Sequence, residues 1–190
     1  MLLYRKVLTL QKKKENIAEY LLYMWQVEDL LRACQLDETT IGNMLTKRFG
    51  QYPSMTEATM SQIRQWYMEL NQMMLSEGKR ESGHLQINEN VIIELTDLHL
   101  RLLKSGQDAI YTSCYYSTLP IIVELRSKSG AEKKGEIETC FTALYGKLLL
   151  HLQGKEVTSE TDLAMRQISK FVGLLAEKYR MYKNGELDLD

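Results

Sequence analysis

Three polar residues occupy helical positions whose neighbours are apolar, and their side chains could do chemistry. Glu28 projects into the most apolar arc of one predicted helix, His99 projects among Leu and Ile residues of a second, and Arg126 projects onto the apolar side of a third. A carboxylate in an apolar interior is costly unless it is paired, so a cation or a hydrogen-bond donor must reach Glu28. We expect Arg126 to be that partner.

Two interpretations of this cluster are open. Glu28, His99 and Arg126 can form a structural polar cluster that ties three helices together, because buried polar groups are normally satisfied inside the protein. Alternatively, they form the floor of a pocket at the bundle core, which would make the chain a small-molecule-binding protein or an enzyme. The walls of that pocket would be aromatic: Tyr23, Trp25 and Tyr115.

No catalytic or metal-binding motif accompanies the cluster. The Glu-x-x-His pattern of di-iron bundles occurs once, at Glu81 and His84, in a predicted break between helices. Glycine-rich phosphate loops and a GxSxG elbow do not occur. We therefore predict no metal, no cofactor and no catalytic residue. His84 is noted as a weaker candidate, because loops often carry functional residues.

Helical periodicity recurs along most of the chain, and short polar breaks separate about seven predicted helices. The predicted helices span 16–36, 37–48, 54–78, 88–106, 108–128, 136–153 and 159–183. Pro120 predicts a kink in the fifth helix, or a break into two pieces between Tyr116 and Pro120. Short connections favour antiparallel neighbours, so the expected fold is an all-α, single-domain, up-and-down helical bundle.

The ends of the chain are predicted to lie outside that bundle. We expect an N-terminal arm over 1–14, the helical bundle over 15–183 and a flexible tail over 184–190. The arm lacks the charge order of a signal peptide, and the longest apolar run, 20–25, is far shorter than the ~20 residues that span a bilayer. Three cysteines without CxxC spacing fit a reducing compartment, so we expect a cytoplasmic protein.

Charge and methionine content indicate what kind of partner the chain has. A net charge of -1 argues against nucleic-acid and membrane binding. Methionine adapts to irregular surfaces, and the third predicted helix carries a small apolar stripe apart from its main core face. That stripe, the candidate interface, consists of Met60, Met68 and Leu75. We therefore expect a non-enzymatic protein-interaction domain that forms a homodimer, and an unknown protein partner is a further possibility.

Six stretches of the chain resemble an uncharacterised, all-helical domain-of-unknown-function family of bacterial cytoplasmic proteins. The stretches are 15–30, 83–88, 94–103, 119–126, 136–141 and 167–171. The resemblance covers nearly the whole chain after residue 14, and the N-terminal arm is longer than expected for that family. It implies an all-helical fold and a bacterial source. It implies no reaction, no cofactor and no catalytic residue.

Overall fold

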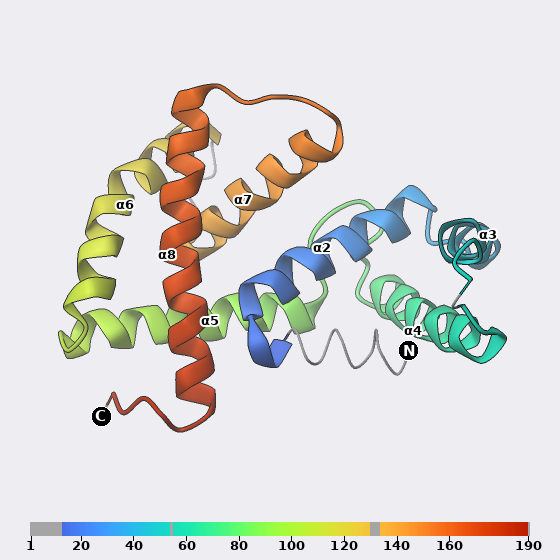
Figure 1. Cartoon of the computed structure of the whole chain (residues 1–190), viewed down its shortest axis with the longest axis horizontal. Coiled ribbons are helices and arrows are strands. Elements are labelled where there is room, and N and C mark those ends of the chain that lie inside the picture. The colour runs from blue at the N-terminus through green and yellow to red at the C-terminus, as the bar shows by residue number, and fades with distance from the viewer. Residues whose placement is uncertain (1–12, 54, 130–133, 190) are drawn as a thin grey trace. The chain divides into compact units, whose positions relative to one another are not determined.

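The computed structural model describes residues 13–53, 55–129 and 134–189, and within these ranges it contains helices and no strand. Seven helices are labelled in Figure 1. They are α2 (Ile17–Ala33), α3 (Glu38–Phe49), α4 (Glu57–Ser76), α5 (Gln86–Ser105), α6 (Ala109–Ser129), α7 (Glu136–Leu152) and α8 (Ser159–Lys183). The predicted all-α, single-domain class is confirmed. Most of the predicted arm lies outside the described residues.

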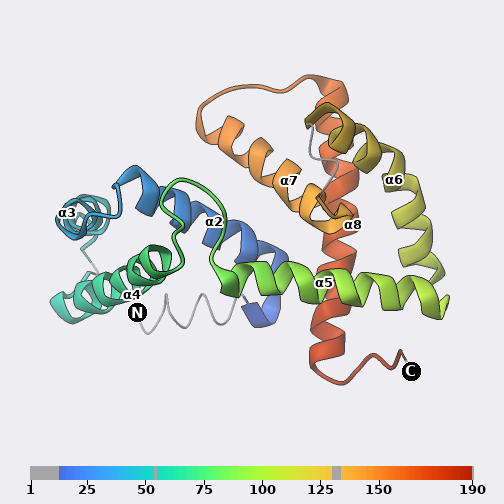
Figure 2. The ribbon, with the colours of Figure 1, turned by 180° about the vertical axis from the view of Figure 1, so that it is seen from behind.

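Contacts within the chain divide it into two compact units, which are considered separately below. Among the described residues, the first unit contains 13–15 and 19–89, and the second contains 16–18 and 90–189. In the first unit α3 packs against α4, as the view from behind in Figure 2 shows. In the second unit α6, α7 and α8 contact one another pairwise. No helix among the described residues has both the length and the apolar character needed to cross a membrane.

The end of α2 is fixed by two residues in the left-handed region and by a contact from α4. Gln35 and Leu36 both have φ of 56°, a conformation that non-glycine residues adopt rarely, so the helix cannot continue through them. The buried side chain of Asn71 donates from Nδ2 to the carbonyl oxygen of Leu36 at 3.1 Å. This hydrogen bond satisfies a carbonyl of the turn that connects α2 to α3.

One apolar face of α8 contributes to the core of the second unit. Ile168, Phe171 and Leu175 of α8 are buried and recur at helical spacing. Thr158 caps the helix, because its hydroxyl oxygen accepts a hydrogen bond from the backbone N–H of Thr161 at 3.2 Å. Gly185, with φ of 72°, lies just past the end of α8, where a left-handed residue is favoured.

The fifth predicted helix is continuous in the structure. α6 runs through Pro120 without interruption, so the predicted break into two pieces is wrong, and a kink at Pro120 stays a prediction. The buried Thr118 hydroxyl donates to the carbonyl oxygen of Cys114 at 2.7 Å and accepts from Gln167 of α8 at 3.1 Å. α6 also packs against α7 and α8.

Candidate functional site

Glu28 is fully buried, at 0 % exposure, and the start of α5 satisfies its carboxylate. Oε1 accepts from the backbone N–H of Leu85 at 3.0 Å and from Nδ2 of Asn88 at 2.6 Å. Oε2 lies 2.6 Å from Nδ1 of His84. The predicted partner Arg126 is not among these groups, so that pairing is wrong. Backbone and amide donors at the first turn of a helix replace the guanidinium.

His84 is held in one orientation by Glu28 and by an aromatic ring. Its imidazole stacks on the indole of Trp25, with ring centroids 4.0 Å apart and an interplanar angle of 7°. An ionised carboxylate only accepts hydrogen bonds, so Nδ1 of His84 must carry the hydrogen. In the neutral ring the lone pair is then on Nε2. The side chain is 31 % exposed, which leaves part of the ring in contact with solvent.

Arg32, one turn after Glu28 on α2, holds the loop that precedes His84. Its guanidinium donates to the carbonyl oxygen of Lys79 at 3.2 Å and to the carbonyl oxygen of Gly83. It also pairs with Asp29 at 2.8 Å. Glu28 and Arg32, on adjacent turns of α2, therefore both form hydrogen bonds with the connection between α4 and α5.

Asn88 lies inside the first turn of α5. The predicted helix begins at residue 88, whereas α5 begins at Gln86. The Asn88 side chain is buried, and its Oδ1 has no hydrogen-bond partner among the described residues. Its Nδ2 donates to Glu28 at 2.6 Å. The contact with Glu28 therefore sets the orientation of the amide.

His99 belongs to a separate aromatic cluster in the second unit. The side chain is 2 % exposed, and its Nδ1 lies 2.7 Å from the hydroxyl of Tyr111. Burial lowers the pKa of His99, and the nearby Glu136 carboxylate partly opposes that effect. A neutral ring fits this geometry if Nδ1 accepts from Tyr111 and Nε2–H points toward Glu136, 3.9 Å away.

Tyr115 completes the His99 cluster. Its ring centroid lies 4.7 Å from that of His99, and its hydroxyl donates to Oε2 of Glu136 at 2.9 Å. Burial, reinforced by the hydrogen bond to Glu136, raises the pKa of Tyr115. The cluster therefore joins His99 to Tyr111 and Tyr115 through a hydrogen bond and ring contacts, and a structural role for His99 stays a prediction.

The other predicted residues are distributed among several helices. Tyr23 of α2 stacks on Trp66 of α4 with ring centroids 6.4 Å apart, and Arg126 lies on α6 in the second unit. The candidate interface residues are all on α4 and partly exposed: Met60, Met68 and Leu75. Cys34, Cys114 and Cys140 are buried, and burial raises the pKa of the Cys140 thiol to about 12.

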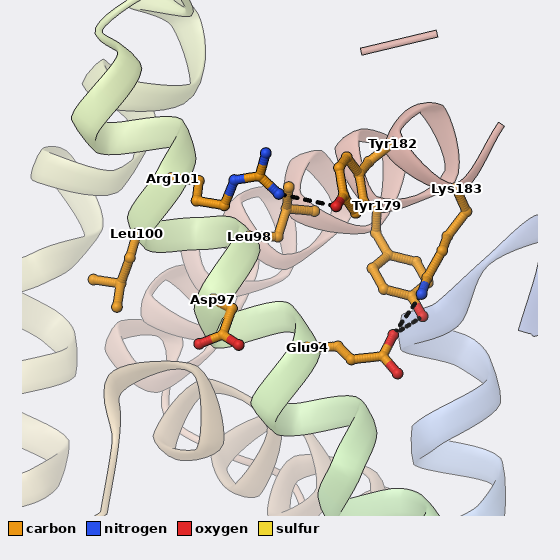
Figure 3. Close-up of a pocket in the computed structure, with 8 residues that line it drawn as sticks. All are labelled: Glu94, Asp97, Leu98, Leu100, Arg101, Tyr179, Tyr182 and Lys183. Carbon is orange, nitrogen blue, oxygen red and sulfur yellow. Dashed lines mark hydrogen bonds and ion pairs between the residues drawn. The ribbon is translucent and has the colours of Figure 1, made fainter. Parts of the chain in front are cut away.

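A hollow of about 480 Å³ lies on the second unit between α5 and α8 (Figure 3). Glu94 accepts from the Tyr179 hydroxyl at 2.7 Å and pairs with Lys183 at 2.8 Å. Arg101 donates to the Tyr182 hydroxyl at 2.9 Å. These hydrogen bonds and the ion pair connect α5 to α8. We therefore interpret the hollow as part of the contact between two helices rather than as a ligand site. None of the predicted site residues lines it.

His84 and Asn88 are the site residues whose roles the sequence analysis missed. They lie 56 and 60 residues from Glu28 in the sequence, and helical projection says nothing about contacts at that separation. Two signals were available in the sequence. His84 lies in the longest break between predicted helices, and Asn88 lies at the start of the next predicted helix. Neither signal identifies Glu28 as the partner.

In the described part of the chain, fold and site together define an all-helical protein in which a buried carboxylate contacts a partly exposed histidine and a second histidine lies in an aromatic cluster. The chain belongs to the family described as "Domain of unknown function (DUF4924)", whose model matches residues 7–186. This confirms the resemblance to such a family and extends the match into the predicted arm. No curated protein and no solved structure matches the chain.

Proposed function

We propose that this chain is a non-enzymatic interaction domain that binds a second copy of itself through the exposed face of α6. The exposure of Glu28 (0 %) and His99 (2 %) favours structural roles for both over the alternative of a ligand pocket at the core. The proposal therefore depends on the surface of the chain rather than on its buried polar groups.

The single observation that carries the proposal is an exposed helix face without charge. No charged residue occurs within 109–123. The large apolar side chains on this face are widely exposed: Ile110 is 75 %, Tyr116 is 60 % and Val123 is 55 % exposed. Its other exposed residues are small or uncharged: Ala109, Ser113, Ser117 and Pro120. Exposed apolar surface grouped in this way is typical of interaction sites.

The opposite face of α6 is already used inside the second unit. Its buried residues are Tyr111, Cys114, Tyr115, Thr118 and Ile122. A helix with apolar residues on more than one side is normally covered on more than one side. The exposed face of α6 therefore resembles the surface of an interface rather than an ordinary solvated helix face.

A second copy of the chain is the partner that this face fits best. An uncharged face does not repel an identical face, and a two-fold axis brings the same residues together from both copies. The uncharged face lies within residues 109–123, so it is ~22 Å long and ~10 Å wide. This is smaller than the ~800 Å² per partner of a standard interface, and we expect a micromolar dimer.

Sedimentation velocity over a range of concentrations tests the proposal. The unmodified chain is expected to shift from monomer to dimer as concentration rises. Tyr116→Lys and Val123→Lys should each weaken the dimer at least about tenfold, a change of about 1.4 kcal/mol, because each places like charges across the two-fold axis.

Leu163→Lys is the matched control. Leu163 is 68 % exposed and lies near the start of α8, away from the uncharged face of α6 in sequence. This variant should associate like the unmodified chain. A monomer at every concentration, or equal weakening by all three substitutions, would contradict the proposal. Weakening by Met68→Lys alone would instead favour the candidate interface on α4.

A further inference from the structure

We propose that His84 is a phosphoryl-accepting histidine, and that its Nε2 atom takes the phosphoryl group from an activated donor such as an acyl phosphate or a phosphoramidate. The proposal goes beyond self-association and rests on different residues. It depends on three features of the first unit: the protonation of the ring, its access to solvent and the charges around it.

Glu28 selects which nitrogen of His84 can react. Oε2 lies 2.6 Å from Nδ1, and an ionised carboxylate can only accept, which assigns the hydrogen to Nδ1 and the lone pair to Nε2. The same arrangement of carboxylate and imidazole fixes the tautomer in hydrolytic triads. When Nε2 bonds to phosphorus the ring becomes cationic, and the Glu28 carboxylate beside it stabilises that charge.

The ring is both ordered and reachable. Stacking on Trp25 at 4.0 Å covers one face of the imidazole, and Arg32 holds the carbonyl oxygens of Lys79 and Gly83 on the same loop. The His84 side chain is still 31 % exposed, whereas Glu28 behind it is buried. Part of the imidazole is therefore reachable from solvent, while the carboxylate remains shielded from water.

Positive charge lies close to His84 on the same loop. A Cβ atom placed on Gly83 would be 3.4 Å from Nζ of Lys79, so this ammonium group lies beside the residue that precedes His84, and it pairs with Oε1 of Glu89 at 2.9 Å. Arg80 is exposed on the same loop. The start of α5 already holds the Glu28 carboxylate through Leu85 and Asn88. The Arg80 guanidinium can offset the charge of an incoming phosphoryl group.

The reaction balances without any further reagent. The Nε2 lone pair attacks phosphorus, the N–P bond forms, and the bond from phosphorus to the leaving group breaks. An acyl phosphate releases its carboxylate, and a phosphoramidate releases ammonia after it gains a proton from water. The hydrogen on Nδ1 stays between His84 and Glu28 throughout.

Phosphoramidate as the donor tests the proposal on the unmodified chain. Phosphorus NMR and mass spectrometry should find one acid-labile phosphoryl group, on Nε2 of His84. His151 is the internal control, because it is exposed on α7 and has no carboxylate hydrogen bond among the described residues. His84 should react at least about tenfold faster than His151, as expected for an imidazole with an orienting carboxylate.

Glu28→Gln tests whether the carboxylate is a positioning group. An amide at this position can donate to Nδ1 and move the ring hydrogen to Nε2, so phosphorylation at Nε2 should fall by about tenfold or more. Nitrogen NMR of the unmodified chain reports the tautomer directly, so the proposal stays testable even if the variant does not fold. His84→Gln should remove the modification, and His151→Gln should not.

Three results would overturn the proposal. One is a ring of His84 that carries its hydrogen on Nε2 in the unmodified chain. Another is modification of His84 no faster than that of His151, or attached at Nδ1. The third is a folded Glu28→Gln variant that reacts at the rate of the unmodified chain.

Discussion

Glu28 is a buried carboxylate whose hydrogen-bond donors come from a helix start. Its two oxygens accept from a backbone N–H, an amide and an imidazole, all within residues 84–88. Such donors are fixed by the backbone of α5, whereas an arginine partner would also have to lose side-chain entropy. The carboxylate therefore links α2 to the start of α5 without an ion pair to Arg or Lys.

Replacement of Asn88 by Leu should destabilise the protein by about 1.5–3 kcal/mol, because it removes a buried hydrogen bond to a charged group. Urea denaturation followed by circular dichroism measures the change. Gln72→Leu, at an exposed position of α4, is the control and should change stability by less than about 0.5 kcal/mol. A loss of the same size in both variants would mean that Asn88 does not support Glu28.

His99 makes folding stability depend on pH. Burial lowers its pKa below the ordinary value of 6.5, so the unfolded chain binds a proton more readily than the folded chain. Stability is therefore complete above pH 6.5 and falls as pH decreases below it, with a slope of up to about 1.4 kcal/mol per pH unit from this group. Urea denaturation at several pH values measures the slope.

His99→Gln is the comparison for that pH series. Glutamine can still accept from the Tyr111 hydroxyl but does not titrate, so the variant should lose less stability on acidification. The informative quantity is the difference in slope between the two chains, because other groups titrate equally in both. Parallel slopes below pH 6.5 would mean that His99 does not cause the dependence.

At the scale of elements, α2 contacts the connection between α4 and α5 through side chains on two consecutive turns. Glu28 binds the start of α5, and Arg32 binds the carbonyl oxygens of the preceding loop. Together these contacts order a connection that contains a glycine in the left-handed region, Gly83 at φ of 85°. The position of His84 therefore depends on α2 as much as on its own loop.

Arg32→Met should loosen the loop between α4 and α5. The variant keeps most of the apolar stem but leaves the carbonyl oxygens of Lys79 and Gly83 without this donor. We expect amide hydrogen exchange of residues 80–85 to become at least about tenfold faster, while exchange in the core of α4 changes little. Mass spectrometry of exchanged peptides measures both regions.

Arg166→Met is the control for that experiment. Arg166 is also paired with an aspartate, Asp162 at 2.7 Å, but its side chain is 76 % exposed and it binds no loop carbonyl. Exchange in residues 80–85 should match that of the unmodified chain. If both variants accelerate exchange there, a general loss of stability rather than the Arg32 contacts is responsible.

At the scale of the whole molecule, the proposed self-association through the uncharged face of α6 predicts how the oligomeric state responds to salt. Salt screens charged contacts but has little effect on an apolar interface, or strengthens it. We therefore expect the dimer to persist when the ionic strength rises to about 1 M, as measured by sedimentation velocity. Dissociation on adding salt would indicate a charged interface elsewhere on the chain.

The positions of the helices could be predicted because the signals for them are local. Apolar periodicity placed α8, and Thr158 and Gly185 lie at the start and end that capping preferences predict. The burial of Glu28 was predicted in the same way, from its neighbours on α2. Each of these predictions needs only residues a few turns apart, where helix geometry determines which side chains share a face.

The partner of Glu28 was decided by tertiary structure. Arg126 was a reasonable candidate by charge and periodicity, but the hydrogen bonds come from His84, Leu85 and Asn88. Packing of α2 against the start of α5 brings these groups to the carboxylate across 56 to 60 positions of sequence. The sequence by itself determines the helices, because these follow from local periodicity. It also determines that Glu28 requires a hydrogen-bond donor, because its neighbours on the helix bury the carboxylate. Only the folded structure determines which donor is within 3 Å.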